Sequence, residues 1–414
     1  MKEHHKILGL LASGTFVEQF DCMLYVHLAV VLNESFFPKT DPHTQKLLGA
    51  FAFSMPYVLR PLGALLLGYI GDIKGPKYTI VVTTFLMGIS CLVMAVLPTY
   101  AQIGMPAAIA LIVCRTLQSF AALGEMIGAQ LYLTEKFTPP AQYLMVLLIG
   151  CAADMGGICA IGGAHLTILY GFNWRIVFLL GAGIAILSSL LRSKLNDTSS
   201  WLKPIKNRLS QQGNTLDLRD SYPLSTFKTA IAYCCLLFLW PVGFYFIYIY
   251  CSELLKSNFG YHINQIIAHN LLFSIVSPFV MCLIGWLTLR VHPFKIMKVR
   301  LFLFGVFIIL IPTILDMIKT PFQLLVLQAL SVILWPSMRP GEPIFFTYFN
   351  KIQRFRYVST LFSVAKTIIH IVTSIGFVLV INQFKNWGIL VLVAPIVISY
   401  AMGLTYFQNL ESKK

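Results

Sequence analysis

Twelve long apolar runs, separated by charged residues, prolines and glycines, constrain this chain more than any other feature. The hydrocarbon core of a bilayer is about 30 Å thick, and about 20 apolar residues in a helix cross it. The runs have this length, so the sequence predicts an all-α integral membrane protein with about twelve transmembrane helices. We expect them at residues 7–32, 47–71, 78–98, 104–134, 142–169, 175–192, 227–252, 266–290, 298–316, 321–338, 357–382 and 387–409.

The balance of polar and apolar residues excludes a soluble globule. Of the 414 residues, 57% are hydrophobic and 11% are charged. Soluble domains have about 25% charged residues, so this chain has too little polar surface to coat a globule of its size.

One long polar stretch divides the predicted helices into two groups of six. Residues 193–226 include several basic residues and breaks such as Pro204. We therefore predict an N-terminal six-helix bundle at 1–192, a cytoplasmic linker at 193–226 and a C-terminal six-helix bundle at 227–414.

The distribution of Lys and Arg predicts the orientation in the membrane. If the N-terminus is inside, the inner segments hold 22 of the 31 basic residues and the outer segments hold six. Cytoplasmic loops are enriched in basic residues, so both termini are expected to be cytoplasmic. The net charge of +15 follows from this asymmetry and does not indicate nucleic-acid binding.

Motifs for metal, cofactor and nucleotide chemistry do not stand out in the sequence. The nine cysteines lie in or beside apolar runs without metal-ligand spacing, so we expect neither a metal site nor disulfides. Because the phosphate-binding pattern Gly-x-x-x-x-Gly-Lys-Ser/Thr does not occur, ATP-driven transport is disfavoured. The sequence also shows no nucleophile or metal constellation of an intramembrane enzyme.

Two segments resemble signatures of the major facilitator superfamily. Residues 60–77, RPLGALLLGYIGDIKGPK, are similar to its signature in the loop between helices 2 and 3. Residues 115–129, RTLQSFAALGEMIGA, with Glu135, are similar to its helix 4 signature in the form that metabolite:proton symporters carry. Further segments resemble landmarks of the proline/betaine and dicarboxylate importers within this branch: 18–25, 36–38, 173–175, 243–250 and 356–357.

The chain departs from the family pattern at three positions. Ile73 and Pro76 stand where the loop signature usually has basic residues, which weakens the charge network expected around Asp72. In the second half, Leu289 replaces an acidic residue, so gating contacts there are not expected to match those of the first half.

The resemblance implies a major facilitator fold, in which two bundles rock about a site near the middle of the membrane. It implies transport driven by a proton gradient, without a bound cofactor, in a bacterial inner membrane. We also expect a monomer. A gating role is implied for five residues of the loop signature, namely Arg60, Asp72, Lys74, Gly75 and Lys77.

Ionisable side chains inside the predicted helices are candidate functional residues, because each costs about 2.5–3.5 kcal/mol at mid-helix. Glu18 and Asp21 share one face of helix 1, with Tyr25 one turn further on, where we expect it to contact the substrate. Arg115 and Gln118 begin a polar stripe on helix 4, and we expect both to contact the substrate. We hypothesise that Asp21, with Glu18, takes the coupling proton, and that Arg115 pairs alternately with Asp21 or a substrate carboxylate. The alternative is a permanent Asp21–Arg115 salt bridge that joins the two helices.

Two further charged residues have two interpretations each. Glu125 lies ten residues beyond Arg115 and is either a second proton site or a gating or helix-pairing residue. Lys366, with His370 on the same face of helix 11, either binds a second substrate anion or pairs with a carboxylate of the protein.

Aromatic residues of helix 7 surround Pro241 and Gly243, where a break in the helix is predicted. Trp240 and Tyr245 would then face a cavity and attract a quaternary ammonium group. The alternative is an aromatic belt at the membrane interface with ordinary packing.

The sequence thus predicts a proton-coupled symporter that imports a small carboxylate-bearing metabolite, and a proline- or betaine-like zwitterion is favoured. A dicarboxylate such as 2-oxoglutarate, an uncoupled facilitator and a non-transporting receptor or scaffold are the alternatives, in that order.

Overall fold

Long helices make up almost all of the protein that the structure describes. A computed structural model describes residues 2–38, 42–194, 227–351 and 353–413, and helices are the only regular elements in these ranges. A helix satisfies its backbone hydrogen bonds within one segment, which a chain in hydrocarbon requires.

The first half of the chain contains the six helices that the sequence predicts there and one short extra turn. Each long helix matches a predicted run to within a few residues at either end. The helices are α1 (Lys2–Phe36), α2 (Pro42–Lys74), α3 (Pro76–Val96), α4 (Tyr100–Ile103), α5 (Met105–Lys136), α6 (Ala141–Tyr170) and α7 (Trp174–Arg192).

The second half also covers its six predicted runs, but three of these runs are broken into shorter elements. The seventh run comprises α9 (Phe227–Leu237), α10 (Leu239–Phe244), the π-helix η1 (Tyr245–Tyr250) and α11 (Cys251–Phe259). The eighth and ninth comprise α12 (Ile263–Ser274), α13 (Val276–Thr288) and α14 (Pro293–Met317). The last three contain α15 (Pro321–Leu334), α17 (Arg354–Phe384) and α18 (Trp387–Glu411), and the 3₁₀ turn η2 (Arg339–Gly341) and α16 (Glu342–Thr347) lie between the tenth and eleventh runs.

The helix lengths confirm the predicted membrane architecture. In the described residues, eleven helical segments are long and apolar enough to cross a bilayer. The remaining predicted span, 47–71, lies within α2, whose 33 residues correspond to about 50 Å of helix. The chain is therefore a multi-pass, all-α membrane protein.

Two arginines lie at or just beyond the ends of predicted spans. Arg192 is the last residue of α7, where the predicted helix 175–192 also ends, and it is fully buried. Arg339 lies in the 3₁₀ turn η2, one residue beyond the predicted run 321–338, whose helix α15 ends at Leu334.

Residue contacts divide the chain into two compact units. Unit 1 comprises Met1–Tyr132, Leu148–Ser199 and Phe355–Thr360, and unit 2 comprises Leu133–Leu147, Ser200–Arg354 and Leu361–Lys414. The bundle boundaries 1–192 and 227–414 stay a prediction, and nearly all of the predicted linker, 193–226, lies outside the described residues.

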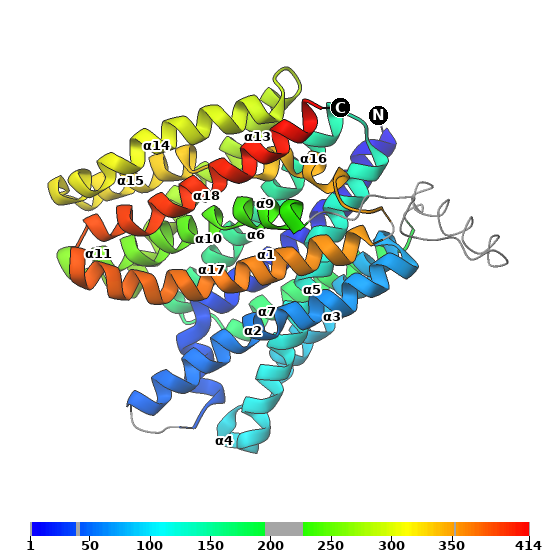
Figure 1. Cartoon of the computed structure of the whole chain (residues 1–414). Helices are drawn as coiled ribbons and strands as arrows, with labels where there is room; N and C mark the ends of the chain where they lie inside the picture. The colour runs from blue at the N-terminus through cyan, green and yellow to red at the C-terminus, as the bar shows by residue number, and fades with distance from the viewer. Residues whose placement is uncertain (1, 39–41, 195–226, 352, 414) are drawn as a thin grey trace. The chain divides into compact units, whose positions relative to one another are not determined.

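In unit 1, close helix packing positions α1 against its neighbours. α3 packs along α7, and both contact α1 (Figure 1). A Cβ atom added at Gly156 of α6 would lie 2.1 Å from the carbonyl oxygen of Phe16 in α1, so only glycine permits this approach. The segment of α1 that contains Glu18 and Asp21 is thus held at short distance from α6.

In unit 2, Pro241 and Gly243, around which a break is predicted, lie in the short helix α10, and a π-helix follows it. α18 packs against both α9 and α14 (Figure 1). Beyond α10, the chain changes to π geometry over Tyr245–Tyr250, and Gln328 of α15 donates a hydrogen bond of 2.7 Å to the carbonyl of Ile247. This amide satisfies a backbone acceptor where the regular α-helical ladder is interrupted.

Candidate functional site

Two helices of unit 1 bring the predicted charged residues together. Glu18 and Asp21 lie on one face of α1, and Arg115, Gln118 and Ala122 follow one another at helical spacing on α5. These two faces meet in the structure, because Arg115 and Gln118 both contact Asp21.

The Asp21 carboxylate accepts hydrogen bonds from three side chains. Arg115 Nη1 lies 3.1 Å from Asp21 Oδ2, and Gln118 Nε2 lies 2.9 Å from Asp21 Oδ1. The Cys91 thiol of α3 donates to Oδ1 over 3.2 Å. Arg115 Nη1 also donates to Gln118 Oε1 over 2.7 Å, so the amide links both charged groups.

Burial makes this ion pair sensitive to the loss of either charge. Asp21, Arg115 and Gln118 are all buried. Removing one partner of a buried pair leaves an uncompensated charge, which costs about 3–5 kcal/mol. The pair is therefore stable only while both groups are ionised or while another ion replaces one of them.

Tyr25 contacts the guanidinium group with its ring. The guanidinium carbon of Arg115 lies 3.9 Å from the centroid of the Tyr25 ring, a cation–π distance. The buried Tyr25 hydroxyl has no hydrogen-bond partner among the described residues. Tyr25 therefore positions Arg115 from one side, and its predicted contact with a substrate stays a prediction.

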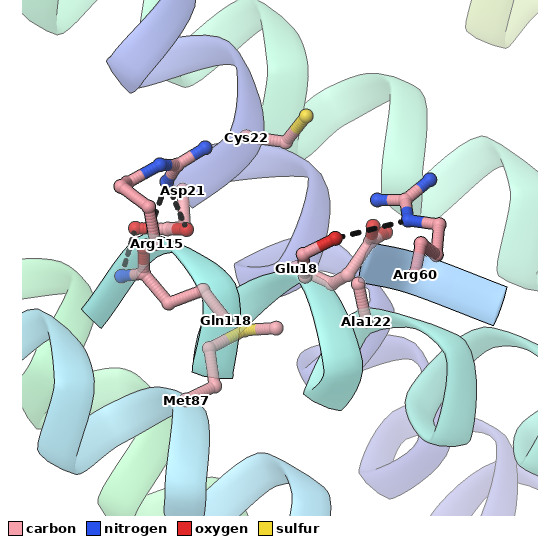
Figure 2. A pocket seen from close by; sticks show the side chains of 9 residues that line it. Glu18, Asp21, Cys22, Arg60, Met87, Arg115, Gln118 and Ala122 are labelled. Atoms are coloured by element: carbon pink, nitrogen blue, oxygen red, sulfur yellow. Dashed lines mark hydrogen bonds and ion pairs between the residues drawn. The ribbon is translucent and has the colours of Figure 1, made fainter. Parts of the chain in front are cut away.

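A pocket opens beside the ion pair. It has an empty volume of about 310 Å³, including its open mouth. Figure 2 shows Asp21, Arg115 and Gln118 on one side of it, and Glu18 and Arg60 on the other. Nine residues line the pocket: Glu18, Asp21, Cys22, Arg60, Met87, Arg115, Gln118, Ser119 and Ala122.

Arg60, predicted as a gating residue, lies in this pocket, where its Nε donates to Ser119 Oγ over 3.2 Å. It stands twelve residues before Asp72, about 18 Å along a continuous α2. The structure therefore places Arg60 apart from the other residues of the loop signature.

A second buried ion pair lies further along α5. Arg192 Nη1 lies 2.5 Å from Glu125 Oε1, and both side chains are fully buried. Thr84 donates to the other Glu125 oxygen over 2.5 Å. Arg192 also donates to the backbone carbonyls of Leu10 and Leu11, so it ties α7 to the start of α1. These contacts give Glu125 a helix-pairing environment, and a role in proton transfer stays a prediction.

Sequence reasoning missed Arg192 and Cys91 as partners in these clusters. Arg192 is the last residue of the predicted helix 175–192, and Glu125 in an apolar helix requires a cation nearby. Cys91 is one of nine cysteines in or beside apolar runs, and its thiol donates to Asp21. No pattern in the sequence distinguishes this cysteine from the other eight.

Asp72 binds the beginning of α17 within unit 1. Its Oδ1 accepts hydrogen bonds from the backbone amides of Phe355 and Arg356, at 3.1 and 3.4 Å. Its Oδ2 lies 3.3 Å from Arg356 Nε. The cap residue of α17, Gln353, makes no side-chain cap, so Asp72 supplies the missing acceptor from another helix.

The remaining residues of the loop signature lie at the turn between α2 and α3. Gly75 has a φ of 91°, which favours glycine, and it permits the tight connection. Lys74 is exposed and lies over the Tyr78 ring at 4.5 Å, and Lys77 is partly buried. Their predicted gating role stays a prediction.

The predicted site residues of unit 2 lie in aromatic surroundings. The Tyr245 ring packs 4.9 Å from the Phe377 ring. Arg339 lies over Trp240 at 5.6 Å, and Lys366 lies over the Phe362 ring at 4.3 Å. Trp240, Tyr245 and Lys366 are all partly buried, and their contact with a substrate stays a prediction.

Membrane-spanning helices with a buried ion pair beside a pocket are the arrangement expected of a secondary transporter. The family model described as Major Facilitator Superfamily matches residues 11–377, so the chain belongs to this superfamily.

Curated relatives are transporters of small molecules. The chain is 30% identical to the proline/betaine transporter of Salmonella typhimurium over 234 residues, which are 54% of this chain and 45% of the relative. It is 31% identical to the citrate-proton symporter of Salmonella typhi over 200 residues, which are 47% of this chain and 46% of the relative. The matched part thus spans about half the length of these relatives.

Solved structures share the fold. The proton:xylose symporter XylE bound to 6-bromo-6-deoxy-D-glucose superposes with a TM-score of 0.79, over 98% of this chain and 95% of that one. At 13% identity this similarity concerns the fold alone.

Proposed function

We propose that the chain is a proton-coupled secondary transporter that imports a small carboxylate-bearing metabolite. The buried Asp21–Arg115 pair, which lines the unit 1 pocket with its two atoms 3.1 Å apart, carries this proposal. A carboxylate and a guanidinium can exchange partners when a proton and an anion enter together.

The mechanism follows from charge balance in the pocket. A proton that binds Asp21 neutralises the carboxylate and ends its ion pair with Arg115. A substrate carboxylate then replaces Asp21 on the guanidinium, where Gln118 offers a further polar contact. Neither ligand alone preserves the balance, so proton and substrate binding favour each other.

The proline/betaine relative favours a zwitterionic substrate. The citrate-proton symporter supports a multiply charged anion as a second candidate, because the pocket contains a second guanidinium, that of Arg60. Lys366 would be a further cation for such an anion.

We also propose the membrane in which the protein lies, its orientation there and its oligomeric state. The bacterial relatives and the basic inner segments support a bacterial inner membrane with both termini in the cytoplasm. We expect a monomer driven by a proton gradient, with no cofactor.

Uptake into proteoliposomes tests the proposal. Labelled proline, glycine betaine and 2-oxoglutarate would be supplied with and without an inward proton gradient, to wild type and Asp21→Asn. We expect gradient-driven accumulation of one solute, and we expect the variant to lose it because Asn cannot carry the proton. Uptake that only equilibrates would show a facilitator, and coupled uptake by Asp21→Asn would refute the role of Asp21.

A further inference from the structure

A thiol shares the Asp21 carboxylate with Arg115 and Gln118. Cys91 of α3 is 1% exposed, and its Sγ donates to Asp21 Oδ1 over 3.2 Å. On the basis of the proposed transport function, we infer that Cys91 is a positioning residue for the coupling proton. It donates to Asp21 while the carboxylate is charged, and it accepts a hydrogen bond from Asp21 once the carboxyl group is protonated.

Arg115 and Gln118 cannot make this change. A guanidinium has no acceptor, so Arg115 Nη1, 3.1 Å from Asp21 Oδ2, can only donate. The Gln118 amide is held by its other contact: its Oε1 accepts from Arg115 over 2.7 Å, and its Nε2 therefore faces Asp21 Oδ1 over 2.9 Å. A protonated carboxyl group needs an acceptor for its O–H, and neither of these side chains offers one.

The Cys91 sulfur can be both donor and acceptor. It already accepts a hydrogen bond from Gln118 Nε2 over 3.2 Å. Rotation about the Cβ–Sγ bond turns the S–H group away from Asp21 without moving the sulfur, and a weak donor loses little when it is left unpaired. Among the described residues that hydrogen-bond to Asp21, Cys91 is therefore the one whose role can reverse.

The two oxygens of Asp21 differ in which of them suits the proton. Oδ2 faces the positive charge of Arg115, whereas Oδ1 faces Cys91 and the Gln118 amide. A proton that enters through the pocket therefore binds Oδ1, and its O–H points to the sulfur. Cys91 keeps its own proton, so none passes between the two residues. Arg115 loses its anionic partner and can then bind a substrate carboxylate.

Other titratable and charged groups also surround Asp21, and a substitution of Cys91 leaves their charges in place. They are Glu18, Cys22 and Tyr25 of α1, Arg60 of α2, and Cys114 and Arg115 of α5. α6 and α7 contribute no charged residue to the described lining of the pocket. A change in the titration of Asp21 on removal of the thiol would therefore report the hydrogen bond and not a change of charge.

Infrared difference spectroscopy of the purified protein, recorded as a function of pH, tests the inference without a substrate. The C=O stretching band of protonated Asp21 is assigned by its absence in Asp21→Asn, and the S–H band of Cys91 by its absence in Cys91→Ala. Cys91→Ser, which keeps a group that donates and accepts, tests for rescue. Cys114→Ala is the matched control, because this thiol of α5 is also buried but has no hydrogen-bond partner among the described residues.

We expect the S–H band of Cys91 to move to higher frequency as Asp21 becomes protonated, because the thiol stops donating. Both bands should change with the same midpoint. Cys91→Ala should move the midpoint of Asp21 to lower pH by about 0.5–1 pH unit, the effect of one hydrogen bond. The sign follows because the neutral carboxyl group loses its acceptor, whereas the carboxylate keeps two donors. Cys91→Ser should lie closer to the wild type, and Cys114→Ala should match it.

An S–H band that stays in place while Asp21 is protonated would overturn the inference, and so would an unchanged midpoint in Cys91→Ala. Either result would show that water in the pocket, and not the thiol, accepts from Asp21. An Asp21 that stays ionised for as long as the protein is folded would overturn it as well. Gradient-driven uptake decides the proposed function separately, so a coupled transporter whose Cys91→Ala variant titrates like the wild type would refute only the role of Cys91.

Discussion

Replacing Arg192 should destabilise unit 1 more than any single surface change. Arg192→Met removes the ion pair with Glu125 at 2.5 Å, the contact with Thr84 at 2.8 Å and two donors to the carbonyls of α1. Because Glu125 is fully buried, its charge would be left without compensation, at a cost of about 3–5 kcal/mol. A chain of this size should then unfold at a temperature about 5–10 °C lower.

The assay is thermal unfolding of the purified protein in detergent, followed by intrinsic tryptophan fluorescence. Arg290→Met is the matched control, because Arg290 is exposed and lies over the Trp286 ring at 4.7 Å, and it should change the midpoint little. The double variant Arg192→Met with Glu125→Gln should recover much of the loss, since no buried charge remains. Equal midpoints for Arg192→Met and Arg290→Met, or a double variant less stable than the single one, would refute the reasoning.

Two further predictions concern helix contacts in unit 1. Gly156→Val should sharply reduce the yield of monodisperse protein, because its Cβ would overlap the carbonyl of Phe16. Gly162→Val should keep the yield, since a Cβ at this position would meet no neighbouring atom within 4 Å. Size-exclusion chromatography would measure the two yields, and equal yields would contradict this prediction. Asp72→Leu should accelerate hydrogen exchange at the first amides of α17, because the hydrogen bonds from Asp72 that cap this helix are worth about 1 kcal/mol. Asp72→Asn keeps an acceptor and should accelerate the exchange less. Unchanged exchange in Asp72→Leu would show that this cap is not needed.

The fold could be predicted from the sequence because the bilayer imposes a length on each helix. Every predicted run coincides with helical structure, and the differences are interruptions within runs, as at Tyr245–Tyr250, and shifts of a few residues at helix ends. Basic side chains near a membrane usually face the cytoplasm, so Arg192 at the end of its predicted helix is not expected to be fully buried. The sequence alone does not show that a carboxylate elsewhere, such as Glu125 for Arg192, draws such a charge inward.

The candidate site could be predicted in part, from spacing within single helices. The common face of Glu18 and Asp21 and the stripe that begins at Arg115 follow from helical periodicity. The contact between these two faces depends on how α1 and α5 pack, which periodicity does not determine. The same limit explains why Arg60, assigned to the loop signature by its motif, lies in the pocket instead.

The positions of the two buried ion pairs along α5 suggest that they have different roles. Arg115 and Glu125 are about 15 Å apart on this helix, so their pairs interact weakly through charge alone. The Asp21–Arg115 pair lines the pocket, where a substrate carboxylate can replace one partner. The Glu125–Arg192 pair lines no part of this pocket and holds backbone carbonyls of α1, so exchange there would cost helix contacts. One pair is thus placed to change with the ligand and the other to keep α1 fixed while it does so.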